Sequence, residues 1–124
     1  MDWHKVFLNE SQICQGLGAF ANQNINNGDL IEYGVARVLN NVDGHENPIL
    51  FHRSDTIPNQ NWALLFGCAH FYNTSLNPNT EVIRDFQNNT FKIKAIQQIK
   101  KGDELTHRYK SFKSEKWFSD LKLK

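Results

Sequence analysis

Two short sequences, each with a glycine followed by an aspartate, constrain the fold of this 124-residue chain most strongly. They are Ile25-Asn26-Asn27-Gly28-Asp29 and Ile99-Lys100-Lys101-Gly102-Asp103. Because glycine adopts a positive φ at little cost, each sequence favours a tight turn that leads into a β-strand. The turns resemble each other closely, which we interpret as repeated turn chemistry and not as a repeat architecture. We therefore expect a mainly β fold with little helix.

The segments around these turns have strand character. We predict strands at residues 30–39 and 104–109, and a hairpin whose strands at 80–86 and 90–96 flank Gln87-Asn88-Asn89. Residues 40–48 are polar and predict a surface loop, whereas residues 51–61 predict irregular structure. A short C-terminal helix is expected from Ser114, with Trp117 on its apolar side. No internal boundary is evident, so residues 1–124 predict a single domain.

Composition narrows the classes of function. The formal net charge is +1, so no strong field attracts nucleic acid or an anionic membrane. The two cysteines, Cys14 and Cys68, are too few for a disulfide framework, and no CxxC sequence is present for zinc. The N-terminus lacks the pattern of a signal peptide, and no apolar run is long enough for a membrane span. We expect an intracellular protein that binds neither nucleic acid nor membrane directly.

The sequence Gly16-Leu17-Gly18-Ala19-Phe20-Ala21 formally matches the dinucleotide-binding fingerprint. A Rossmann unit requires a helix directly after these glycines, but residues 22–29 are rich in asparagine, a poor helix former. We therefore expect a glycine-permitted bend between strands. Two glycines this close also allow a backbone to approach a ligand without interference from Cβ atoms.

A polar stretch, Asn73-Thr74-Ser75-Leu76-Asn77-Pro78-Asn79, follows the apolar residues 62–69. Its side chains are of the kind that cap turns, and the same residue types can hold a polar small molecule at the edge of a pocket. Cys68 and His70 lie just before it, but two such residues are too few for a metal site or an oriented nucleophile, so no metal is expected.

Residues 104–109 alternate in character and place Leu105, His107 and Tyr109 on one face of a strand. A tyrosine at the end of such a face is usually a core residue with a hydrogen-bonded hydroxyl. Trp117 is likewise most often a packing residue. Each motif by itself therefore has an ordinary structural explanation.

Together and in order, the motifs resemble the SET-domain family of protein lysine methyltransferases. The family has a Gly-x-Gly sequence near its start, which Gly16-Leu17-Gly18 matches. Its Asn-His-Ser-x-x-Pro-Asn segment matches residues 73–79 at every fixed position except Thr74, where histidine is usual. Its Gly-Asp/Glu-Glu-Leu/Ile-Thr-x-x-Tyr segment matches residues 102–109 throughout. The resemblance covers about residues 6–117, and the small size is most similar to the stand-alone SET proteins of large DNA viruses.

The resemblance implies a β-clip-like fold of several small sheets, in which a threaded C-terminal segment passes beneath an earlier loop. It implies S-adenosylmethionine as cofactor and a lysine side chain as substrate. The residues expected to contact the cofactor form one set: Gly16, Leu17, Gly18, Asn73, Thr74, Tyr109 and Trp117.

Tyr109 is the expected catalytic residue, since its hydroxyl can orient the amine of the substrate lysine. Tyr33, Phe66 and Tyr72 are weaker candidates for the walls of the substrate channel. An apolar channel favours the neutral, nucleophilic amine over the ammonium.

If the protein is viral, the leading substrate is a histone tail of the host, in its nucleus or cytoplasm. A ribosomal or a viral protein is the alternative substrate. A homodimer is a further expectation, since a single domain this small offers little surface for both cofactor and peptide. The change at Thr74 motivates a second reading, a SET fold without catalysis that serves as a protein-binding module.

Overall fold

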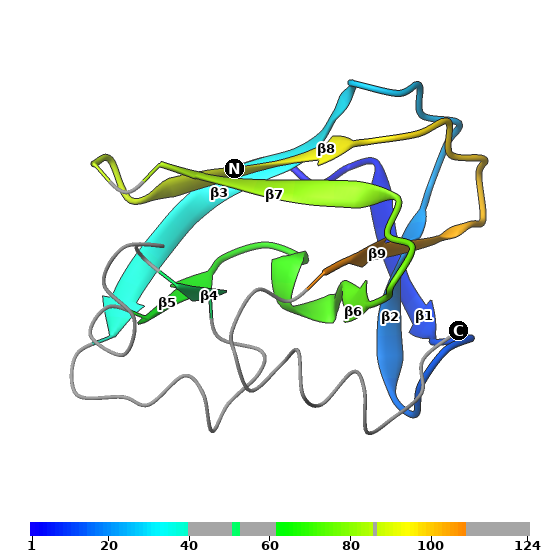
Figure 1. Cartoon of the computed structure of the whole chain (residues 1–124), viewed down its shortest axis with the longest axis horizontal. Helices are drawn as coiled ribbons and strands as arrows, with labels where there is room; N and C mark the ends of the chain where they lie inside the picture. Colours follow the sequence, from blue (N-terminus) through cyan, green and yellow to red (C-terminus); the bar gives the residue numbers. More distant parts are fainter. Residues whose placement is uncertain (40–50, 53–61, 86, 109–124) are drawn as a thin grey trace.

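The computed structural model describes residues 1–39, 51–52, 62–85 and 87–108. Within these ranges the chain forms two β-sheets and one short 3-10 helix, η1 (Ala69–Phe71) (Figure 1). The mainly β class is confirmed. The expected C-terminal helix and threaded segment lie outside the described residues, as do Tyr109 and Trp117. No helix in the described ranges is long and apolar enough to cross a membrane.

The first sheet has four strands in the order β1-β2-β9-β6. These are β1 (Val6–Glu10), β2 (Leu17–Ala21), β9 (Glu104–His107) and β6 (Asn73–Thr74). The second sheet has five strands in the order β4-β5-β3-β8-β7. These are β4 (Phe51–His52), β5 (Trp62–Leu65), β3 (Leu30–Leu39), β8 (Thr90–Ala95) and β7 (Thr80–Asp85).

The strands that were predicted from neighbouring turns agree best with the structure in their bounds. β3 has the predicted bounds, and β7 and β8 form the predicted hairpin, with β8 ending one residue early at Ala95. β9 ends at His107, whereas the predicted strand continued to residue 109. The prediction was therefore wrong at Arg108. By contrast, five strands were not predicted: β1, β2, β4, β5 and β6. The prediction of irregular structure over residues 51–61 was wrong at β4. The two residues of β6 form a strand only because they pair with β9, which is a non-local contact.

The two Gly-Asp turns pair with each other. Ile25 and Ile99 exchange both backbone hydrogen bonds, each with an N–O distance of 2.8 Å, and both side chains are fully buried. Gly28 and Gly102 have nearly the same positive φ, 91° and 92°. This confirms that the two sequences use the same turn chemistry. The pairing of the turns joins the segment after β2 to the segment after β8.

Each turn also donates a backbone hydrogen bond to the carbonyl of an alanine. That alanine is the last residue of the strand that precedes the other turn. The Ala95 carbonyl accepts from Gly28 N at 2.8 Å, and the Ala21 carbonyl accepts from Gly102 N at the same distance. In each turn the aspartate side chain accepts a hydrogen bond from the backbone three residues earlier, at Asn26 and Lys100. The paired turns therefore connect β2 to β9 and β8 to β3 in equivalent ways.

A β-bulge in β3 decides which side chains of this strand face the core. The register against β8 shifts between Leu30 and Glu32, and two consecutive side chains, Ile31 and Glu32, are consequently both buried. Beyond the bulge, Glu32 and Gly34 face inward while Tyr33 and Val35 face outward. Uninterrupted alternation from Ile31 would have placed Tyr33 inside and Glu32 in solvent.

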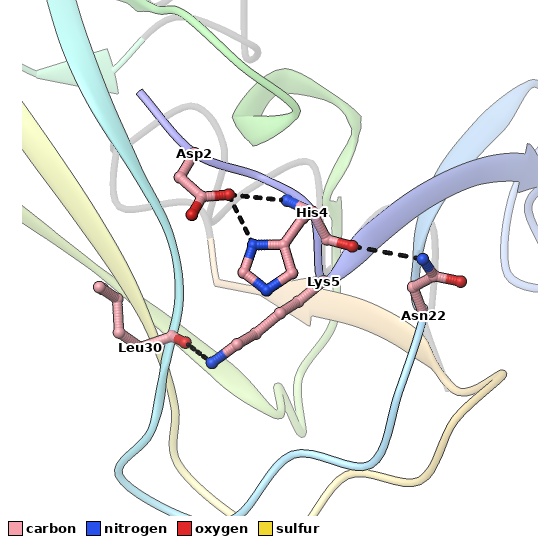
Figure 2. Close-up of polar contacts among 5 residues, drawn as sticks. All are labelled: Asp2, His4, Lys5, Asn22 and Leu30. Carbon is pink, nitrogen blue, oxygen red and sulfur yellow. Dashed lines mark hydrogen bonds and ion pairs between the residues drawn. The ribbon is translucent and has the colours of Figure 1, made fainter.

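The N-terminal residues hold the start of β1 against the rest of the fold (Figure 2). The Lys5 ammonium group donates to the Leu30 carbonyl at 2.8 Å, and the Asn22 carboxamide donates to the His4 carbonyl at 3.2 Å. Asp2 accepts from His4 N at 3.0 Å, and the His4 ring lowers the pKa of its exposed carboxyl together with this backbone bond. These contacts attach the residues before β1 to the start of β3 and to the residue that follows β2.

The core lies between the two sheets. Its buried members are aliphatic and aromatic side chains from both sheets, with the largest being Tyr72, Phe91, Ile25, Ile93, Ile99 and Leu105. Glu32 is buried among them with 1% of its surface exposed. Burial raises the pKa of its carboxyl group, opposed by the Cys68 N–H and the Tyr72 side chain.

The first prediction concerns the two cysteines. Burial, with a smaller contribution from the Glu32 charge, raises the pKa of the Cys68 thiol to about 11, whereas Cys14 is exposed. Because the thiolate is the reactive form, we expect a thiol reagent near pH 8 to modify Cys14 at least about 100-fold faster than Cys68 in the native protein. Mass spectrometry of Cys14→Ser should then show very slow labelling of Cys68, which becomes rapid in denaturant. Equal native rates would contradict this burial.

The second prediction concerns Glu32 and pH. Between the ordinary carboxyl pKa of about 4.3 and the raised folded value, the folded protein keeps a proton that the unfolded chain has lost, so stability falls as pH rises. Glu32→Gln removes this ionisation. We expect its free energy of unfolding to exceed that of wild type by on the order of 1 kcal/mol near pH 8 and by less near pH 4. Urea unfolding at both pH values measures this. Glu81→Gln, at an exposed position on β7, is the control, and a pH-independent difference for Glu32→Gln would contradict the prediction.

Candidate active site

Strand β9 lies between β2 and β6 and brings together the three sequence motifs (Figure 1). On one edge it pairs antiparallel with β2, with Glu104 opposite Phe20. On the other edge it pairs parallel with β6, with Asn73 opposite Thr106 and Thr74 opposite His107. The Gly16–Gly18 segment, the Asn73 segment and the start of β9 are therefore neighbours, although they are far apart in the sequence.

The carboxamide of Asn73 is fixed in one orientation. Its Nδ2 donates to the Leu17 carbonyl at 3.2 Å and to Glu104 Oε2 at 3.1 Å. Since a carboxamide has two N–H donors, both are used within the protein. Its Oδ1 has no donor among the described residues and is left as an acceptor for a ligand. The arrangement suits a ligand that presents an N–H group, such as an ammonium.

Glu104 is the centre of the hydrogen bonds around this site. Besides the bond from Asn73, its Oε2 accepts from Ser11 Oγ at 2.7 Å, and its Oε1 accepts from Gln12 N at 2.8 Å. Ser11 Oγ in turn accepts from the backbone N–H groups of Ile13 and Cys14. All groups that face the carboxylate are thus donors. Glu104 joins the loop between β1 and β2 to the partly exposed Asn73.

The glycines of the Gly-x-Gly motif have different roles. Gly16 makes the turn, with φ of 100°. Gly18 lies inside β2, where a Cβ atom would stand 2.5 Å from Glu104 Oε2 and 3.1 Å from Asn73 Nδ2. The prediction of one bend over both glycines was wrong for Gly18, which is required for close approach within a strand. Leu17, between them, is 49% exposed.

Asn79, the last residue of the polar segment, stabilises β9 through its side chain. Its Oδ1 accepts from Thr106 N, and its Nδ2 donates to the Glu104 carbonyl, both at 2.9 Å. Thr80 Oγ1 adds a bond to the Thr106 carbonyl at 2.7 Å. The carboxamide therefore acts as a substitute for a neighbouring strand. It thereby holds the backbone of Glu104, whose carboxylate accepts the hydrogen bonds from Ser11, Gln12 and Asn73.

The other predicted site residues lie in different surroundings. Thr74 is buried, with 3% exposed, and pairs with His107. Tyr72 is fully buried in the core, while Tyr33 and Phe66 are 43% and 42% exposed. The structure thus brings Gly16, Leu17, Gly18, Asn73 and Thr74 together. The channel role of Tyr33, Phe66 and Tyr72 stays a prediction, as do the roles of Tyr109 and Trp117, which lie outside the described residues.

Glu104, Ser11 and Asn79 were not singled out as site residues from the sequence. Ser11 and Glu104 are 93 positions apart, and no local pattern shows that they meet. Asn79 is a fixed position of the polar motif, which could have indicated a structural role for it. Among the described residues, no three His, Cys, Asp or Glu side chains form a group that could hold a metal ion.

Comparison with protein families gives a match to the SET domain over residues 16–110. No curated protein sequence matches the chain significantly. Solved structures share the fold. A Plasmodium falciparum protein assigned as a candidate histone methyltransferase superposes with a TM-score of 0.69 at 24% identity, covering 87% of this chain and 96% of the other.

Polycomb repressive complex 2 of Chaetomium thermophilum is also similar. One structure of it matches with a TM-score of 0.72 at 21% identity, over 96% of this chain and 16% of the other. A humanised mutant of the same complex, bound to the inhibitor GSK126, matches with a TM-score of 0.69 at 23% identity over 85% of this chain and 15% of the other. At these identities the likeness establishes the fold.

The described strands include the Gly-x-Gly segment, the Asn73 segment and the Glu104 strand in one sheet, and the family match extends over most of the chain. The chain therefore belongs to the SET-domain family.

Proposed function

We propose that this protein is a protein lysine methyltransferase that uses S-adenosylmethionine. The observation that carries the proposal is the meeting of Gly18, Asn73 and Glu104 in a chain of the SET-domain family, in which such methyltransferases occur. When bound, S-adenosylmethionine supplies a methyl group on a positively charged sulfur, so no acid is needed to activate the leaving group. The work of the protein is then mainly alignment and exclusion of water.

The described residues fit a cofactor with an amino-acid end. Asn73 Oδ1 is an acceptor suited to its ammonium, because Leu17 and Glu104 already use both Asn73 donors. The absence of a side chain at Gly18 leaves room for the Glu104 carboxylate and the Asn73 carboxamide to lie against β2, which holds the Asn73 acceptor in place. Thr74 keeps the backbone groups that the usual histidine would offer. Tyr109 and Trp117 are proposed to complete the site from outside the described residues.

The reaction requires a neutral lysine amine, whose ordinary pKa is about 10.4. We propose that an apolar channel with Tyr109 at its end disfavours the ammonium, which releases its proton to solvent before the amine attacks. Tyr33, Phe66 and Tyr72 remain the proposed wall candidates. Of these, Tyr72 is the least suited to contact substrate directly, since its side chain has no exposed surface in the described fold.

A histone tail is the proposed substrate, and an intracellular location accompanies it. The support is that one structural neighbour is assigned as a candidate histone methyltransferase, and another structure of the Chaetomium complex contains H3K27me3. We also keep as a proposal the resemblance to the stand-alone SET proteins of large DNA viruses. A non-catalytic binding module is the alternative, favoured by the threonine at position 74.

The third prediction tests the reaction. We expect the protein to transfer labelled methyl from S-adenosylmethionine to lysine in histones, and Tyr109→Phe to lower the rate at least about tenfold or to change the number of methyl groups added. Mass spectrometry of histones and of a cell lysate measures both. If no protein is labelled and no cofactor binding is measurable, the proposal is overturned and the non-catalytic module is favoured.

The fourth prediction tests the cofactor site. Asn73→Asp places a second carboxylate oxygen against the Leu17 carbonyl and Glu104, where two N–H donors now lie. We expect cofactor affinity to fall by at least about tenfold, because acceptor oxygens would then face each other without a donor between them. Isothermal calorimetry measures this. Asn77→Asp is the matched control, since it makes the same change at an exposed position of the same segment, and an equal effect of both variants would refute the assignment of Asn73.

A further inference from the structure

The bulge in β3 places a carboxyl group behind the loop that leads to Asn73. Glu32 Oε2 accepts from Cys68 N at 3.1 Å. The backbone before Cys68 passes so close that a Cβ atom on Gly67 would lie 2.7 Å from the same oxygen, and Gly67 has φ of 118°. Only glycine fits this approach. The entrance of the loop is therefore built around the Glu32 carboxyl group.

The same carboxyl group reaches the last residue of the loop. Tyr72 is fully buried, and burial, followed by the nearby Glu32 charge, raises the pKa of its hydroxyl well above the ordinary value. Within the described part of the chain, neither Tyr72 Oη nor Glu32 Oε1 has a partner in hydrogen-bond geometry. The Tyr72 ring also packs edge-on against His107 of β9, with centroids 6.5 Å apart. Tyr72 thus contacts both sheets at the position directly before Asn73.

Other contacts hold the beginning and middle of this loop. Phe66 N donates to the Val35 carbonyl at 3.0 Å, and His70 Nε2 accepts from Leu65 N at 2.8 Å. Both bonds attach the loop to the second sheet. The position of Asn73 relative to this sheet then depends on Tyr72, the side chain that connects the second sheet with β9.

We propose that Glu32 is a positioning residue for the cofactor site, which acts through the Cys68 backbone and Tyr72 to hold Asn73 in place. The cofactor part of this inference rests on the proposed function. Glu32 itself does not touch the cofactor. The bulge provides this carboxyl group, because it turns Glu32 inward in place of Tyr33 where Gly67 and Cys68 of the loop pass β3.

The test compares Glu32→Ala with Glu32→Gln. A glutamine can still accept from Cys68 N, and its amide can donate to Tyr72 Oη, so it should rescue the function. We expect Glu32→Ala to weaken cofactor binding at least about tenfold with kcat at saturating cofactor changed by less than about threefold, and Glu32→Gln to stay within about twofold of wild type. The control is Ile25→Val or Ile25→Ala, whichever lowers Tm as much as Glu32→Ala does. Ile25 is buried in the paired turns.

A purely structural role for Glu32 predicts equal losses of cofactor affinity in Glu32→Ala and in the Ile25 control, and that result would overturn the inference. A second readout does not need the cofactor. In the free protein, the NMR signals of the Asn73 side-chain amide, assigned by their loss in Asn73→Asp, should move in Glu32→Ala and return in Glu32→Gln. If wild type binds no cofactor, the proposed function fails, and unmoved Asn73 signals in Glu32→Ala would separately refute the positioning role.

Discussion

The hydrogen bonding of β9 on both of its edges is the constraint on which the rest of the structure depends. This strand has four residues, too few to be stable as an isolated segment. It is held by β2, by β6 and by the carboxamide of Asn79. Because its first residue carries the carboxylate that orients Asn73, the strand joins the scaffold directly to the chemistry. Loosening any of these partners would disturb both the site and the core, because Leu105 of the same strand is a fully buried core residue.

Carboxyl groups organise the site at two depths. Glu104 is partly exposed and surrounded by donors from the loop after β1 and from Asn73. Glu32 lies in the core behind the same asparagine, where burial raises its pKa. The first gives orientation through charge-assisted hydrogen bonds, which are strong. The second gives position through the backbone, at a cost in solvation that an apolar residue would avoid.

The sequence predicted those parts of the fold that depend on local chemistry. The Gly-Asp turns and the bounds of β3 follow from backbone preferences of the residues concerned, and the motif order indicated the family. β6 was not predicted because it exists only through its pairing with β9. The inward Glu32 and outward Tyr33 were not predictable either, since a bulge changes the face of every later residue without a signal in composition. Glu104 was missed as a site residue because its partner Ser11 is 93 positions away.

The bond between Ser11 and Glu104 has a consequence for how the protein is made. A ribosome synthesises the chain from its N-terminus, so the loop after β1 emerges long before its carboxylate partner. Until Glu104 follows, Asn73 lacks one of its two fixed acceptors and β2 has an open edge. Contacts between such distant positions slow folding, and an open strand edge favours association with other chains. The hydrogen bonds around Asn73 are therefore completed only after Glu104 has been synthesised, and the edge of β2 stays open until then.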